Sequence, residues 1–105
     1  MTIQSDLDAI VHKINLILPE AKVYLFGSYA AGTQRRDSDI DLCVVAPKYS
    51  ERRMQVLCLI RAAIRGTTKL SVDVLAFTDE EFEGKSKSRS TIQYTIANEG
   101  VLLSG

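Results

Sequence analysis

The sequence has no tryptophan, a single histidine, and only two cysteines and two prolines among its 105 residues. Zinc sites are built from clustered cysteine and histidine, so this scarcity argues against one. Cys43 and Cys58 form no CxxC pair, and both stand in apolar stretches. We therefore expect two buried free thiols rather than a disulfide. His12 falls outside the apolar stripe of its predicted helix, and we expect it at the surface.

The sequence also lacks net charge and long apolar runs. Thirteen basic residues balance thirteen acidic ones, so no overall field favours nucleic acid or a membrane surface. No apolar run approaches the roughly 20 residues that span a bilayer. The first twenty residues carry Asp6, Asp8 and Pro19, unlike a signal peptide. We expect residues 1–105 to form one soluble, cytoplasmic domain with no membrane contact.

Hydrophobic periodicity gives an alternation of helices and strands. The apolar positions from Leu7 to Leu18 follow one helical face, with Ser5 as its cap and Pro19 as its end. The pattern then predicts strands at 22–26, 39–46 and 70–77, one helical turn at 28–31 closed by Gly32, a loop at 33–38, and a helix at 51–65. This alternation predicts an α/β (α+β) fold with a small mixed sheet flanked by helices.

Two capping boxes indicate further helices near the end of the chain. Thr78 to Glu81 predicts a short helix, and Ser90 to Gln93 predicts another that runs to about Asn98. Between them, 84–90 carries lysine and arginine among serines, which predicts a flexible basic loop. The apolar segment 101–103 follows Gly100 as a terminal strand or packing segment, and we favour a place in the core.

Three aspartates stand where strands are predicted, although aspartate is depleted in strands. Asp39 and Asp41 lie two residues apart at a strand start, so both project from one face while Ile40 and Leu42 project from the other. Asp73 interrupts a later apolar strand. Like charges held close together repel each other, whereas Mg²⁺ binds carboxylates together with substrate phosphates. The alternative is that Asp39 and Asp41 flank a turn and face water.

A glycine and a serine strengthen the metal hypothesis. Gly27 and Ser28 follow a predicted strand and open a helical turn, a geometry in which backbone N–H groups face an anion. Glycine allows close approach of a phosphate, and the serine hydroxyl adds a donor. Each signal is weak alone. Together they predict a phosphate-binding turn beside a carboxylate cluster.

The segments 27–33 (GSYAAGT) and 37–42 (DSDIDL) resemble the signature of the DNA polymerase β-like nucleotidyltransferases, and of their minimal members above all. The resemblance covers nearly the whole chain, Asp73 included. It implies a nucleotidyltransferase enzyme that uses ATP and two Mg²⁺ ions. Asp39, Asp41 and Asp73 would be its catalytic, metal-binding residues, and Gly27 and Ser28 its nucleotide-binding residues.

The sequence departs from this family pattern at three positions. Tyr29 and Ala31 stand where members often carry arginine, and Arg36 stands where many carry proline. The carboxylates and the glycine-serine pair are intact. The departures therefore put substrate affinity or acceptor choice in doubt more than the chemistry.

The resemblance also implies a partner. Larger relatives append a domain that grips the acceptor, whereas minimal members are often antitoxins that pair with a HEPN-domain toxin, and some modify it with AMP. We expect AMP transfer to a hydroxyl of such a partner. The alternatives are a binding module that acts by contact alone and an enzyme that adds nucleotides to RNA, against which the neutral charge counts. A homo-oligomer stays open.

Overall fold

The computed structural model describes residues 3–48 and 52–104. Its elements follow in the order α1 (Ile3–Ile17), β1 (Lys22–Phe26), α2 (Ser28–Ala31), β2 (Ile40–Ala46), α3 (Arg53–Ile64), β3 (Val72–Thr78), α4 (Asp79–Ser86), α5 (Ile92–Glu99) and β4 (Val101–Ser104). The predicted alternation of helices and strands is confirmed. None of these helices has the length and apolar character that crossing a membrane requires.

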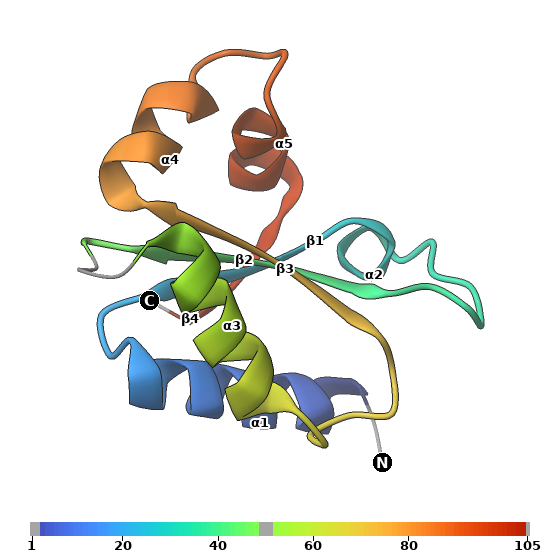
Figure 1. The fold of residues 1–105 in the computed structure, drawn as a ribbon. Helices are drawn as coiled ribbons and strands as arrows, with labels where there is room; N and C mark the ends of the chain where they lie inside the picture. The colour runs from blue at the N-terminus through green and yellow to red at the C-terminus, as the bar shows by residue number, and fades with distance from the viewer. Residues whose placement is uncertain (1–2, 49–51, 105) are drawn as a thin grey trace.

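The four strands form one mixed sheet in the order β3-β2-β1-β4. β1 pairs antiparallel with β2 and β4, whereas β2 and β3 are parallel and are connected through α3. Helices α1 and α3 lie on one face of the sheet, and α4 and α5 lie on the other (Figure 1). The predicted small mixed sheet flanked by helices is therefore correct.

Strand β2 is the centre of the core because it is buried on both faces. Ile40, Leu42 and Val44 point toward α1 and α3, and each is at most 1% exposed. Cys43 and Val45 point to the other face, where they pack with Phe82 of α4 and Ile96 of α5. A strand covered on both sides reads as a continuous apolar run, which explains the sequence after Asp41.

Several predicted element ends were wrong. Ser5 lies within α1 and does not cap it, because the helix already includes Ile3. The cap of α5 is Thr91 rather than Ser90: its hydroxyl accepts from the Tyr94 N–H and donates to backbone carbonyls of the preceding turn. The start of the predicted helix at 51–65 lies partly outside the described residues, since α3 is described from Arg53.

The predicted basic loop at 84–90 was also wrong over its first part, because α4 continues through Ser86. Thr78 forms the expected capping box with Glu81. Acidic residues fill the first turn of α4, and Lys85 lies in its last turn. This arrangement stabilises the helix through its dipole and extends it past Gly84.

Two expectations about burial were wrong. Cys43 is buried, and burial raises the pKa of its thiol to about 12, but Cys58 is exposed on the outer side of α3. The terminal segment forms the expected strand, β4, at the edge of the sheet, where Leu103 packs against the core but Val101 and Leu102 are about half exposed. Only one side of an edge strand meets the sheet, which accounts for this exposure.

Candidate active site

Three strands place the predicted site residues at one end of the sheet. The end of β1 meets the start of β2, where Phe26 is paired with Asp41. The start of the parallel strand β3 meets the same end, where Asp41 is paired with Asp73. Helix α2 lies beside this end of the sheet (Figure 1). Residues far apart in the sequence therefore come together through strand register alone.

The two paired aspartates project from the same face of the sheet. In-register residues of neighbouring strands point the same way, and Ile40 and Leu42 on either side of Asp41 are buried on the opposite face. Asp41 is partly buried, and Asp73 is exposed. Asp39 lies immediately before β2 and is also exposed. The adjacent Ile40 N–H donates to the Ser71 carbonyl at 2.8 Å, which fixes the start of β2 against the chain entering β3.

The electrostatics show that the three carboxylates interact. Burial raises the pKa of Asp41 above its usual value, and the negative charges of Asp73 and Asp39 raise it further. Each charge disfavours ionisation of Asp41, so the protein holds this carboxylate at a cost in free energy when no cation is nearby.

The side chains themselves do not form a ready-made metal cage. Across 3–48 and 52–104, no three histidine, cysteine, aspartate or glutamate side chains lie together closely enough to hold a metal ion. Mutual repulsion keeps like charges apart, while the backbone register keeps Asp41 and Asp73 adjacent. Carboxylate oxygens are the donors that Mg²⁺ prefers, so the residues fit this ion chemically. Their assignment as its ligands stays a prediction.

Gly27 lies directly against the central carboxylate. Its φ is +76°, and a Cβ at this position would overlap Oδ2 of Asp41 and lie 3.2 Å from Cγ. The turn that follows is well fixed: the Ala31 N–H donates to the Gly27 carbonyl, and Gly32 closes α2 in the left-handed conformation. Ser28 is partly buried at the start of α2. The glycine-serine turn and Asp41 therefore form one unit, although nucleotide binding by Gly27 and Ser28 stays untested.

The sequence analysis missed the role of Ser38. Its hydroxyl accepts from the Arg35 N–H at 2.7 Å, and its own N–H donates to the Arg35 carbonyl. This turn sets the path of the chain directly before Asp39, while the side chains of Arg35 and Arg36 stay exposed. A serine three residues after Arg35, at the end of the polar loop, is a signal for such a turn, and it was available in the sequence.

Tyr29 shows how one departure from the family pattern is accommodated. Its side chain is half-buried and packs against the core cluster of α1, β2 and α3. A tyrosine in this position contributes to the fold instead of adding positive charge to the site. Arg35 and Arg36 are the nearest arginines along the chain to Asp39.

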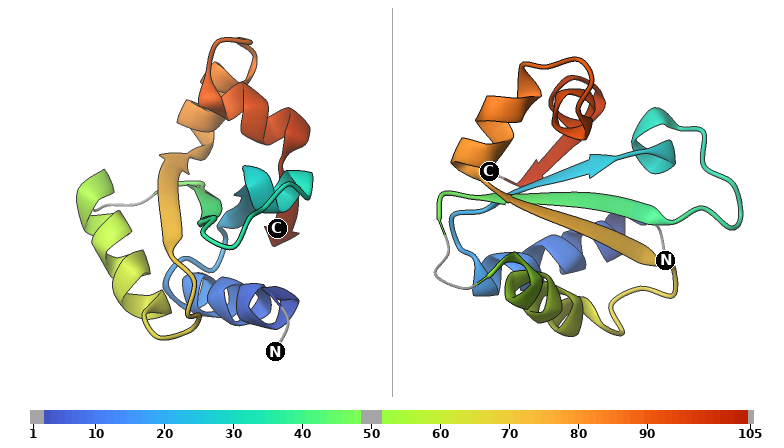
Figure 2. Two further views of the ribbon diagram at one scale, coloured as in Figure 1. Left: turned by 90° about the vertical axis from the view of Figure 1, so that its right-hand side faces the viewer. Right: turned by 45° about the horizontal axis from the view of Figure 1, so that its top comes forward.

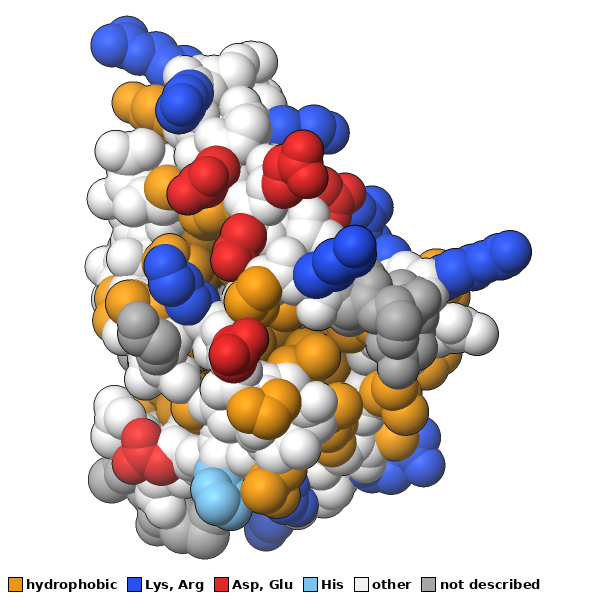
Figure 3. All heavy atoms as spheres, turned by 90° about the vertical axis from the view of Figure 1, so that its left-hand side faces the viewer, with side chains coloured by type: hydrophobic (Ala, Val, Ile, Leu, Met, Phe, Trp, Pro, Cys, Tyr) orange, Lys and Arg blue, Asp and Glu red, His pale blue; other side chains and the backbone are white. Residues whose placement is uncertain are grey.

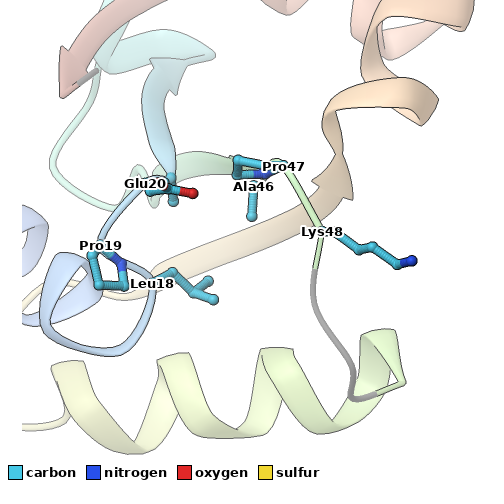
Figure 4. Close-up of a pocket in the computed structure, with 7 residues that line it drawn as sticks. Leu18, Pro19, Glu20, Ala46, Pro47 and Lys48 are labelled. Atoms are coloured by element: carbon cyan, nitrogen blue, oxygen red, sulfur yellow. The ribbon is translucent and has the colours of Figure 1, made fainter.

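A hollow of about 280 Å³ lies at the other end of β2 and differs from the carboxylate site in the side chains that line it. It is lined mainly by apolar residues, with Glu20 and Lys48 as its charged members: Leu18, Pro19, Glu20, Ala21, Ala46, Pro47 and Lys48 (Figure 4). On the face that this end of the molecule presents, acidic and basic side chains are interspersed around hydrophobic ones (Figure 3). No group of convergent polar side chains lines this hollow, whereas the three predicted carboxylates lie at the opposite end of the sheet.

Comparisons with known proteins show the family to which the domain belongs. Residues 7–98 match the family model of the nucleotidyltransferase domain. A segment of 24 residues is 67% identical to the protein adenylyltransferase MntA of Shewanella oneidensis; it covers 23% of this chain and 17% of that protein. The match thus spans well under two thirds of the relative's length.

Two solved structures share the fold. A crystal structure of a toxin-antitoxin with AMP-PNP has a TM-score of 0.61 and 27% identity, covering 93% of this chain and 72% of that one. The toxin-antitoxin MntA-HpeT mutant D39ED41E has the same TM-score and 25% identity, with the same coverage.

The contact between Gly27 and Asp41 predicts unequal effects of two matched substitutions. Gly27 and Gly32 both have φ +76°, but only Gly27 has atoms within 4 Å of an added Cβ. Gly32→Ala should destabilise the fold by about 1–2 kcal/mol, the cost of a left-handed alanine. Gly27→Ala should cost clearly more, because the Asp41 side chain must move. Urea unfolding measures both, and equal losses would contradict the contact.

Proposed function

Because this chain belongs to the nucleotidyltransferase domain family, we propose that it transfers AMP from ATP to a hydroxyl group of a partner protein. The partner in this proposal is a HEPN-domain toxin, and the chain is its antitoxin. The name of the Shewanella relative, a protein adenylyltransferase, supports AMP transfer to protein. The toxin-antitoxin with AMP-PNP supports an adenine nucleotide and a protein partner.

The observation that carries the proposal is the position of Asp41. It lies against Gly27 on one side and in register with Asp73 on the other. The glycine-serine turn and two strand carboxylates thus meet at one point, with Asp39 two residues before Asp41. Nucleotidyl transfer requires this combination, because a triphosphate must be held beside carboxylates that bind its counter-ions.

Each residue has a distinct role in the proposed reaction. Asp39 and Asp41 would hold Mg²⁺, with Asp73 on the acceptor side; two bound ions would supply the charge that stabilises the attacking oxygen and the leaving pyrophosphate. Ser28 and the backbone N–H groups after Gly27 would hold the triphosphate. Asp73, which is exposed like Asp39, would orient the acceptor hydroxyl and take its proton.

One prediction of this proposal concerns nucleotide binding. Replacing Asp39 and Asp41 together with asparagine should abolish Mg²⁺-dependent ATP binding in isothermal titration calorimetry, because the counter-ions of the triphosphate lose their ligands. The variant should stay folded, since Asp39 is exposed and the loss of Asp41 relieves repulsion. Asp37→Asn, in the exposed loop before the site, is the matched control and should bind normally. Binding by the double variant equal to that of the wild type would remove the metal assignment.

The second prediction concerns the partner. The HEPN-domain protein should be toxic when expressed alone, and co-expression of this chain should relieve the toxicity. Mass spectrometry should then find AMP on a hydroxyl side chain of the partner. Asp73→Asn should lower the single-turnover rate of transfer far more than ATP affinity, because it acts mainly in the transition state.

The same experiment separates the alternatives. Asp39→Ala should remove both the AMP and the rescue. Rescue that survives in Asp39→Ala, with no AMP on the partner, would favour a binding module that acts by contact. Efficient nucleotide addition to RNA by the isolated chain would instead favour the RNA alternative and contradict the partner model.

A further inference from the structure

The outer face of α3 is apolar where a surface helix is normally polar. Its inner face is the core stripe of Val56, Ile60 and Ile64. On its outer face, Met54 is 69% exposed and Leu59 is 46% exposed. Together with Gln55 and the exposed Cys58, they line an open hollow of about 490 Å³. Contiguous exposed apolar surface of this kind marks an interaction site.

The same stretch of chain is strongly basic, although the whole chain is neutral. From 52 to 72 there is no acidic residue, and the basic residues are Arg52, Arg53, Arg61, Arg65 and Lys69. Arg53 is turned toward the sheet, where its guanidinium lies 5.7 Å from the centre of the Phe77 ring and pairs with Glu81 of α4. Arg61 and Arg65 are exposed. Arg61, one helical turn after Cys58, therefore adds positive charge at the C-terminal end of the apolar hollow.

The surface continues from this hollow toward the start of β3. Met54, Cys58, Arg61 and Arg65 follow one another at spacings of four, three and four, which places them on one helical stripe. A second hollow, of about 270 Å³, begins at Arg61 and Arg65 and extends to Leu70 and Val72. Val72 packs on the face of the sheet that α1 and α3 cover, whereas Asp73, the next residue, projects from the other face. Helix α3 lies along the outer flank of the molecule beside β3 (Figure 2).

The charge pattern selects the kind of partner. A second copy of this face would bring arginines against arginines, which is unfavourable. Single-stranded nucleic acid would need aromatic side chains for stacking, and this surface has none. A helix with an apolar stripe between acidic residues satisfies both the hollow and the positive charge at its end.

We propose that the outer face of α3 docks an acid-flanked amphipathic helix of the partner protein. The identity of the partner rests on the proposed function, whereas the docking surface does not rest on the transfer chemistry. Leucine-like side chains of the partner fill the hollow at Met54 and Leu59. The carboxylates of the partner helix pair with Arg61 and Arg65, and the second hollow extends the interface to Val72.

The test measures the affinity for the HEPN-domain partner by calorimetry without nucleotide, so that no transfer takes place. Leu59→Glu should weaken binding by about tenfold or more, as expected for an interface anchor. Ile92→Glu is the matched control, because Ile92 is 47% exposed but lies on α5, across the sheet. Arg61→Glu should weaken binding and flatten its salt dependence, whereas Arg89→Glu, in the α4–α5 connection, should change neither.

A cross-link locates the contact directly. Cys58 is exposed and Cys43 is buried, so a benzophenone maleimide will label Cys58 selectively. Irradiation of the complex should join it to a partner peptide that carries aspartate or glutamate beside apolar residues.

Equal affinities of Leu59→Glu and Ile92→Glu would overturn the proposal. Cross-linking between two copies of this chain, or binding of phosphatidylglycerol vesicles that Leu59→Glu abolishes, would do the same. If the partner binds with normal affinity but carries no AMP, the proposed AMP transfer is contradicted and the proposed docking surface is not.

Discussion

The structure depends on one unfavourable contact: the carboxylate of Asp41, partly buried, faces the like charges of Asp73 and Asp39. Such repulsion lowers the stability of the fold, so another interaction must compensate it. Gly27 removes the side chain that would otherwise occupy the same space, and its positive φ turns the chain into α2. The carboxylate of Asp41 and the turn at Gly27 are therefore coupled, because a shift of either one would change their close contact.

The rest of the sheet holds this contact in place. β2 is covered on both faces by helices, so its register against β1 and β3 cannot slip without moving apolar side chains out of the core. The parallel alignment of β2 and β3 requires a crossover, which α3 provides. The helix that places Asp73 beside Asp41 also presents an apolar outer face with arginines toward its C-terminal end. Scaffold and docking surface are in this way two sides of one element.

Much of this arrangement was predictable because it follows from local patterns. The alternation around Asp39 and Asp41, the turn at Gly27 and the capping box at Thr78 each depend on residues close in sequence. The exposure of side chains on the outer side of α3 was not predictable from the same patterns. Cys58 stands in an apolar stretch, yet the core needs only one stripe of α3, so the rest of that stretch faces outward.

The ends of elements were equally hard to predict. Ser90 and Thr91 both suit a helix cap, and only the path of the preceding turn selects Thr91, whose hydroxyl reaches the Lys85 and Ser88 carbonyls. The pairing of Asp41 with Asp73 depends on the order of strands in the sheet, which no local signal determines. The sequence identified the three carboxylates, and the fold determined which of them are adjacent.

The most direct test of this account is thermal unfolding of the wild type and Asp41→Asn from pH 4 to 8, with and without Mg²⁺. The raised pKa of Asp41 means that the folded state holds its proton more tightly than the unfolded state. The wild type should therefore lose stability relative to Asp41→Asn as the pH rises above about 4, the usual aspartate range. At pH 7, Mg²⁺ should restore that stability in the wild type and have little effect on the variant. Identical pH profiles and identical responses to Mg²⁺ would contradict the central claim that this carboxylate cluster is built to share a cation.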